Sequence, residues 1–179
     1  GAGLGARIAD QVRDEDLVRL LDDGHTVVIQ AVHRLWSPVG ELARSLADEL
    51  GHPVQVNAYI TPPGGQGFSA HYDTHDVFVL QCVGRKQWTL HRPVVDHPLA
   101  DDGWNRHRDE VAARASEQPL DAFELREGDC LYLPAGYLHA AEADRELSIH
   151  LTFGIHPVRR TDVLAAAFDA ALAGAESTA

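Results

Sequence analysis

The chain has 179 residues, of which 45% are hydrophobic and 23% charged, which is typical of a globular protein with one domain. Its 27 acidic and 15 basic residues give a net charge of −12, so we expect no direct binding to nucleic acid, whose phosphates such a surface would repel. No apolar run is long enough to span a membrane and no secretory signal is recognisable, so we expect no membrane association. The two cysteines lie in apolar runs and are expected to be reduced, which favours a cytoplasmic location.

Helices and a strand are expected before the middle of the chain. Asp14–Asp22 carries leucines at helical spacing and is followed by Gly24, a typical stop. His25–Gln30 is short and β-branched, which predicts a strand. Ser37 and the following proline predict the start of a second helix, which Gly51 ends. The absence of any Met, including at the first position, suggests that the chain was trimmed or belongs to a longer protein.

From Pro53 onward the pattern changes to short segments rich in Val, Ile, Leu and aromatic residues. Strands without helices between them favour a closed or sandwiched antiparallel sheet. The predicted strands are Val54–Ile60, Asp76–Cys82, Lys86–His91, Ala122–Leu125, Cys130–Leu133 and Leu147–Ile155. The polar stretch Pro93–Leu120 is predicted to be a long functional loop, and Thr161–Ala173 a C-terminal helix.

Two segments of the predicted sheet carry residues that suit a metal. His71 and Asp73 are two apart, so both side chains would leave the same face if Phe68–Asp73 is a strand. His139 follows a Pro-Ala-Gly turn that could direct it back across the sheet. Two imidazoles and one carboxylate favour Fe(II) with open coordination positions, although Mn, Co or Ni would also fit. Without a metal, the first two residues would form a simple His–carboxylate pair.

The motifs around these ligands resemble those of a known family. Gly128–His139 (G-D-C-L-Y-L-P-A-G-Y-L-H) resembles the second motif of the cupin superfamily, and Asn57–Trp88 resembles the JmjC-type 2-oxoglutarate oxygenases, nearest the bacterial ribosomal-oxygenase-like (cupin-4) branch. The resemblance implies a mainly β fold with flanking helices, a double-stranded β-helix barrel over residues 53–157. Residues 1–52 would then pack on the barrel, and the helix in 158–179 could begin a dimerisation region.

The resemblance also implies a cosubstrate, 2-oxoglutarate, bound together with Fe(II) and O2. It places the metal on His71, Asp73 and His139, and the far carboxylate of the cosubstrate on Lys86. A dicarboxylate entering a barrel of low dielectric needs such a cation. Strand alternation sends Arg85 and Lys86 to opposite faces, and we expect Lys86 to point inward. Further hydrogen-bonding neighbours in this pocket are predicted to be Asn57, Tyr59, Thr61 and Thr152.

The expected function is hydroxylation of a side chain in a protein or peptide substrate, which the resemblance suggests could be a ribosomal protein. No protein residue beyond the metal ligands is assigned a catalytic role. Three alternatives stay open: the same chemistry on a small molecule or natural-product peptide, a non-catalytic metal-binding cupin module, and a metal-dependent isomerase or dioxygenase of the general cupin type. A homodimer formed through the terminal helices is also compatible with the sequence.

The remaining aromatic, cysteine and histidine residues are expected to be structural. His75, just after the metal motif, could line the substrate groove, but we favour its interpretation as an exposed turn residue. The residues expected in the core, with both cysteines reduced, are Trp36, Phe78, Cys82, Trp88, Cys130 and Tyr132.

Overall fold

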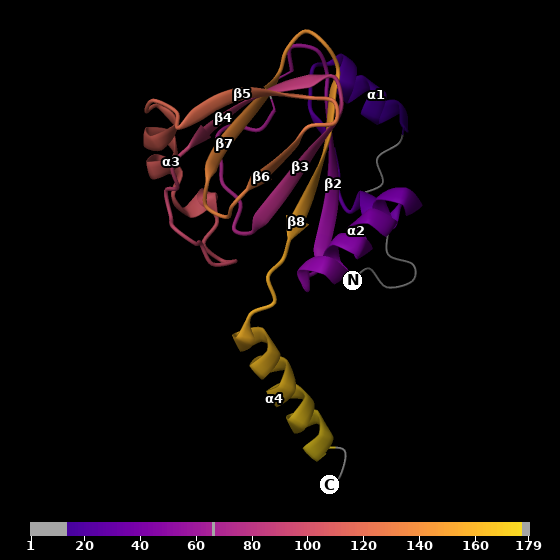
Figure 1. The fold of residues 1–179 in the computed structure, drawn as a ribbon, viewed down its shortest axis with the longest axis vertical. Coiled ribbons are helices and arrows are strands. Elements are labelled where there is room, and N and C mark those ends of the chain that lie inside the picture. Colours follow the sequence, from indigo (N-terminus) through magenta and orange to yellow (C-terminus); the bar gives the residue numbers. More distant parts are fainter. Residues whose placement is uncertain (1–13, 66, 177–179) are drawn as a thin grey trace.

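Two antiparallel sheets face each other and enclose the centre of the molecule (Figure 1). The computed structural model describes residues 14–65 and 67–176. The larger sheet has the order β1-β2-β8-β3-β6, formed by Val27–Ile29, Val54–Thr61, Ser148–Ile155, Asp76–Val83 and Cys130–Leu133. The smaller sheet has the order β5-β4-β7, formed by Asp121–Arg126, Arg85–His91 and Leu138–Ala143.

Side chains of the two sheets meet between them because each strand turns alternate residues inward. Val77 and Val79 of β3 pack with Trp88 of β4, and β5, β6 and β7 contribute Leu125, Leu133 and Ala141 to the same cluster. The expected mainly β barrel with flanking helices is therefore confirmed.

Two helices precede the barrel, and the second covers the outer face of the larger sheet. These are α1 (Asp14–Asp22) and α2 (Ser37–Leu50), with a short 3-10 helix, η1 (Val32–Arg34), between them. Val39 and Ala43 of α2 pack with the outward side chains of β2 and β8. The helix begins with Pro38 in its first turn and ends at Gly51, whose φ of 71° is left-handed, as the sequence predicted.

The polar stretch after β4 is partly helical, so the prediction of one long loop was wrong. It contains η2 (Trp104–Arg106) and α3 (Arg108–Ala115). Val111 of α3 is buried against Tyr72 and Leu138, which anchors the segment beside β7. The few apolar residues in this helix explain why periodicity did not reveal it.

Two further predictions about strands were wrong. Phe68–Asp73 forms no continuous strand; only His71 pairs, through an isolated bridge to His139. Conversely, Leu138–Ala143 forms β7, which the sequence did not predict because three of its six residues are alanine, a weak strand former. Pairing with β4 supplies the hydrogen bonds that stabilise this strand.

Three residues predicted to lie in the core are exposed. Trp36 and Tyr132 have exposed fractions of 58% and 48%, and Cys130 is exposed on the outer side of β6. Trp88 is buried as predicted, whereas Phe78 and Cys82 are partly buried against the core beneath α2.

The last helix, α4 (Arg160–Glu176), extends away from the barrel (Figure 1). Its apolar residues Val163, Leu164, Phe168 and Leu172 are all exposed. None of the helices in the described ranges is long and apolar enough to cross a membrane. The division of the chain near residues 52 and 157 stays a prediction.

Candidate metal centre

His71, Asp73 and His139 come together at one end of the space between the sheets. One ligand atom from each lies within 4.8 Å of the other two, and this is the one group of its kind among the described residues. The Nε2 atom of His139 lies 3.8 Å from Oδ2 of Asp73. The ring centroids of the two histidines are 4.5 Å apart. The three side chains therefore converge on a volume that a single ion could occupy.

Backbone hydrogen bonds hold the three residues in place. The N–H of His71 donates to the carbonyl of His139 at 3.0 Å, and the N–H of His139 returns a bond to the carbonyl of His71 at 2.9 Å. The N–H of Gly136 donates to the carbonyl of Asp73 at 2.9 Å. The Pro-Ala-Gly turn thus joins the two ligand segments.

Both imidazoles direct the same nitrogen toward the convergence point. Nδ1 of His71 lies 2.8 Å from the carbonyl oxygen of Ser69, and Nδ1 of His139 lies 3.0 Å from that of Tyr137. A carbonyl oxygen can only accept, so each Nδ1 carries the proton and each Nε2 keeps its lone pair for a metal. Burial lowers the pKa of His139 to about 4, with help from the neighbouring His71, so its imidazole is neutral and ready to coordinate at pH 7.

A cavity next to this triad contains a buried cation. Lys86 of β4 is 1% exposed and reaches the cavity from the smaller sheet, which also carries His139 on β7. Its ammonium donates to Oγ1 of Thr61 at 2.8 Å, and no carboxylate of the described residues pairs with it. Burial lowers the pKa of Lys86 to about 8.

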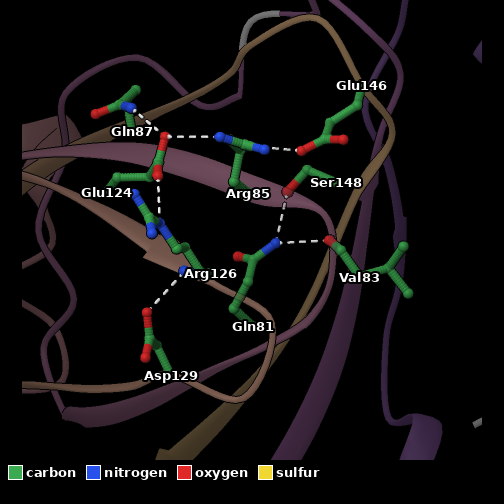
Figure 2. A network of polar contacts seen from close by, with 9 residues as sticks. All are labelled: Gln81, Val83, Arg85, Gln87, Glu124, Arg126, Asp129, Glu146 and Ser148. Atoms are coloured by element: carbon green, nitrogen blue, oxygen red, sulfur yellow. Dashed lines mark hydrogen bonds and ion pairs between the residues drawn. The ribbon is translucent and has the colours of Figure 1, made fainter.

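Arg85, the basic residue next to Lys86 on β4, lies at the surface and is paired with carboxylates. Arg85 points outward into a surface network with Glu146 at 2.6 Å and Glu124 at 3.9 Å (Figure 2). Gln87 and Arg126 donate to the same Glu124. The arginine charge is therefore paired at the surface, whereas the lysine charge faces the cavity without a counter-ion.

Three of the four predicted neighbours of Lys86 lie beside it or in its cavity. Thr61 accepts its hydrogen bond, and a second hydroxyl, that of Thr26, donates to Thr61 at 3.2 Å. Tyr59 and Thr152 line the cavity. Asn57 lies outside it, because its Oδ1 accepts from the N–H of Ala31 and from the side chain of Gln55.

Three aromatic residues of the cavity were not predicted as site residues. Trp88 and His150 form part of its inner wall, and Phe68 lies at the rim. The ring of Phe68 contacts both Tyr59 and His71, with centroid distances of 5.8 and 5.7 Å. Trp88 was interpreted as core, although its inward position two residues after Lys86 would have placed it in the same pocket.

A second cavity adjoins the first on the Asp73 side. It shares Asp73, Tyr59, Val77 and Thr152 with the first cavity, and its remaining walls come from Gln55, Asn57, His75, Gly154 and His156. The ring of His75 stacks on that of His156 at 4.6 Å, with Nε2 close above Gly154. The interpretation of His75 as an exposed turn residue was therefore wrong.

The residues present fit both a metal and a dicarboxylate. Two imidazoles and one carboxylate leave coordination positions open, which suits Fe(II) and similar ions. A buried ammonium without a carboxylate partner is costly, and an anion in the cavity would compensate it. A side chain at Gly67 would collide with the carbonyl oxygen of Ala141, so only glycine lets this segment pass so close to β7.

Comparison with known proteins supports this chemistry. A family model described as a JmjC domain matches residues 34–163. Ribosomal oxygenase 2 of Rattus norvegicus is 36% identical over 133 residues, which cover 73% of this chain and 27% of that protein. The bifunctional lysine-specific demethylase and histidyl-hydroxylase NO66 of Drosophila simulans is 33% identical over 132 residues, 69% of this chain and 15% of that protein. The chain thus spans about a quarter or less of the length of these relatives.

Solved structures show the same fold. YcfD, a ribosomal oxygenase from Escherichia coli, matches with a TM-score of 0.61 and 24% identity over 82% of this chain and 35% of that chain. A second structure of YcfD, in complex with cobalt and 2-oxoglutarate, matches with a TM-score of 0.60 and 23% identity, again over 82% of this chain and 36% of the other.

Proposed function

Because the chain belongs to the JmjC domain family, we propose that it is an Fe(II)- and 2-oxoglutarate-dependent oxygenase that hydroxylates a side chain of a protein or peptide. One observation carries the proposal. A three-residue metal set and a buried lysine that no carboxylate of the described residues pairs with line one cavity, with His139 and Lys86 on neighbouring strands of the smaller sheet. A keto acid with a second carboxylate matches both ends of that cavity.

Each protein group has a defined task. His71, Asp73 and His139 would hold the metal through Nε2, a carboxylate oxygen and Nε2, leaving the remaining positions for cosubstrate and O2. Lys86 binds the far carboxylate, and Thr61 fixes the direction of its ammonium. When bound, Fe(II) and 2-oxoglutarate supply the oxidising chemistry with O2 and release succinate and carbon dioxide. No protein general base is needed.

The walls of the cavity protect that chemistry from water. Trp88, Leu133 and Ala141 form apolar walls contributed by both sheets. Burial and the nearby Asp73 raise the pKa of Tyr59, so its hydroxyl stays protonated and can donate a hydrogen bond. A dry cavity of this kind strengthens the attraction between Lys86 and a carboxylate.

The second cavity is the proposed route for the substrate side chain. It reaches Asp73 from the outside and is lined by amide, hydroxyl and imidazole groups, so a polar side chain suits it better than an aliphatic one. A protein substrate agrees with the names of the relatives, ribosomal oxygenase and histidyl-hydroxylase. We propose a protein with basic segments, such as a ribosomal protein, because the chain carries a net charge of −12.

Location and assembly complete the proposal. We place the protein in the cytoplasm, and we propose that it forms a homodimer through the exposed apolar residues of α4.

The first test is anaerobic titration of Fe(II) and 2-oxoglutarate into the metal-free protein. We expect a weak visible charge-transfer band that requires both components. His71→Ala should abolish the band because the metal loses a ligand. Lys86→Ala should raise the 2-oxoglutarate concentration needed for it by about tenfold to a hundredfold, the usual effect of deleting one partner of a buried charge pair.

Arg85→Ala is the matched control, because it removes the adjacent base from the outer face and should leave the band unchanged. Metal binding without any band would contradict the oxygenase and favour a non-catalytic cupin module. A normal band with succinate formed only in the presence of a small molecule, and with no peptide, would instead redirect the search for a substrate.

A further inference from the structure

Two ring nitrogens in the inner wall of the Lys86 cavity lack hydrogen-bond partners. Nε1 of Trp88 and Nδ1 of His150 are closed off from the surface and have no partner within the part of the chain that the structure describes. The two side chains are 4% and 3% exposed, and both line the cavity. Buried polar atoms are nearly always paired in folded proteins, because an unpaired one costs free energy.

Ring contacts hold both residues beside Lys86. The ring of His150 stacks on Tyr59, with a centroid distance of 4.7 Å and an angle of 6° between the planes. Trp88 meets the edge of His150 at 5.7 Å and lies 5.9 Å from the ring of His139. The pair therefore occupies the wall between the ammonium and the metal ligands.

The protonation state of His150 suits a hydrogen-bond donor rather than a second cation. Burial lowers its pKa to about 3, and the nearby ammonium of Lys86 contributes to the shift. The imidazole is therefore neutral at pH 7 and has one N–H to donate. The indole N–H of Trp88 can only donate.

A carboxylate bound by Lys86 needs more donors than the lysine provides. It offers about four lone-pair positions, and one ammonium that also binds Thr61 cannot fill them. At the buried inner end of the cavity, side chains of the wall can supply the remaining donors.

We propose that Trp88 and His150 bind the cosubstrate directly, donating hydrogen bonds from their ring nitrogens to the distal carboxylate of 2-oxoglutarate beside Lys86. This assignment rests on the proposed function and adds two binding residues to it. It also explains why two polar rings line a cavity that apolar residues could have filled.

The test is calorimetric titration of two keto acids into Mn(II)-loaded protein. One is 2-oxoglutarate, and the other is 2-oxobutyrate, which keeps the metal-binding end but lacks the distal carboxylate. Trp88→Phe removes the indole N–H with little change of shape, and His150→Phe keeps a stacked ring without nitrogens. We expect each variant to bind 2-oxoglutarate about tenfold to a hundredfold more weakly, with its affinities for 2-oxobutyrate and for Mn(II) unchanged.

Trp36→Phe is the control, because Trp36 is exposed and lies outside the cavity. Unchanged 2-oxoglutarate affinity in both cavity variants would overturn the assignment, and so would equal weakening of both keto acids, which would indicate a change of cavity shape. If His150→Phe does not fold, Trp88→Phe decides alone. Failure of the proposed function is recognised separately, because the unmodified protein would then bind Mn(II) but no 2-oxoglutarate, and Lys86→Ala would change nothing.

Discussion

Lys86 is the residue on which the electrostatics of the cavity depend. It is buried with a hydroxyl partner and no carboxylate, so its charge is tolerated in the free protein and compensated only when an anion binds. Strand alternation predicted only that Arg85 and Lys86 face opposite sides of the strand, and the family resemblance assigned the inward side to Lys86. The outward Arg85, paired with Glu146, shows how a shift of one residue in β4 would have exchanged their roles.

The affinity for 2-oxoglutarate should fall as the pH rises above about 8. In the free protein the pKa of Lys86 is lowered to about 8, so above that pH binding must also recover a proton. We expect the dissociation constant measured with Mn(II)-loaded protein to rise by about tenfold per pH unit above pH 8. Lys86→Arg, whose guanidinium stays charged, serves as the control: if this variant binds, its affinity should not change between pH 8 and pH 10. A flat profile for the unmodified protein would contradict the role of the lysine.

The folded protein should lose stability in acid because of His150. Its pKa is about 3 when folded and near 6.5 when unfolded, so between these values the unfolded chain binds a proton that the folded chain does not. The free energy of unfolding should therefore decrease by about 1.4 kcal/mol per pH unit from roughly pH 6 down to pH 4 through this group.

Urea unfolding of metal-free protein across that pH range measures the acid effect. His139, with its pKa near 4, contributes in the same direction, so only part of the slope belongs to His150. His150→Phe should be visibly less sensitive to acid than the unmodified protein. Equal slopes in the two proteins would show that His150 is protonated in the folded state.

At the scale of single elements, the tight turn between β3 and β4 sets the register that directs Lys86 inward. Gly84 joins the two strands with a φ of 63°, and a methyl group there would collide with the carbonyl oxygen of Leu147. Gln81 stabilises the same end of β3, where its amide donates to the Val83 carbonyl at 2.8 Å and the Ser148 hydroxyl at 2.9 Å (Figure 2).

Gly84→Ala should therefore destabilise the protein by at least about 2 kcal/mol more than Gly128→Ala. Both glycines have a positive φ, but a methyl group at Gly128 would meet open space. Both variants bear the cost of placing alanine at a positive φ, so the difference between their free energies of unfolding measures the collision with Leu147 alone. Denaturant unfolding of the two variants measures this difference. Equal destabilisation would mean that the backbone of the turn shifts and relieves the collision without loss of stability.

The elements show where prediction from sequence succeeds and where it fails. Strongly apolar strands such as β3 and β8 were recognisable because their side chains alternate or run continuously apolar. The alanine-rich β7 was not, because its strand conformation comes from pairing with β4 rather than from its own residues. α3 was missed for a related reason, since Val111 is its single buried residue.

The same contrast applies to the site. The metal ligands were found by motif, and their convergence depends on a bridge between residues far apart in the sequence. Asn57 was assigned to the Lys86 cavity together with Tyr59, and alternation does put both on one face of β2, but Asn57 accepts a hydrogen bond from the N–H of Ala31 and lines the adjoining cavity instead. Pairing of β8 with β2 and β3, which local patterns do not encode, also decided the place of His150, whereas alternation from Lys86 would have been enough to place Trp88.

At the scale of the whole molecule, the barrel with α2 and α3 is one packed unit and α4 stands apart (Figure 1). At a concentration low enough for the full chain to be monomeric, removal of residues 160–179 should change the unfolding temperature by no more than about 2 °C, because the described α4 side chains are exposed. The truncated protein should bind 2-oxoglutarate like the full chain. A larger loss of stability would mean that α4 packs against the barrel or against another copy.

Light scattering of the two proteins separates these cases. If α4 forms the homodimer, the mass of the full chain should approach twice the monomer at high concentration, while the truncated protein stays monomeric. A mass of one monomer for the full chain at every concentration would contradict self-association.

Because His71 and His139 are joined by a bridge between distant segments, a bound metal would also stabilise the fold. A metal held by both side chains would cross-link two segments that lie about 70 residues apart in the unfolded chain, and closing a loop of that length is worth about 4 kcal/mol by the chain-entropy argument used for disulfides. The cross-link is reversible and depends on metal supply. Metal starvation would therefore remove the proposed activity and also leave the protein more vulnerable to degradation, because the same three side chains carry both effects.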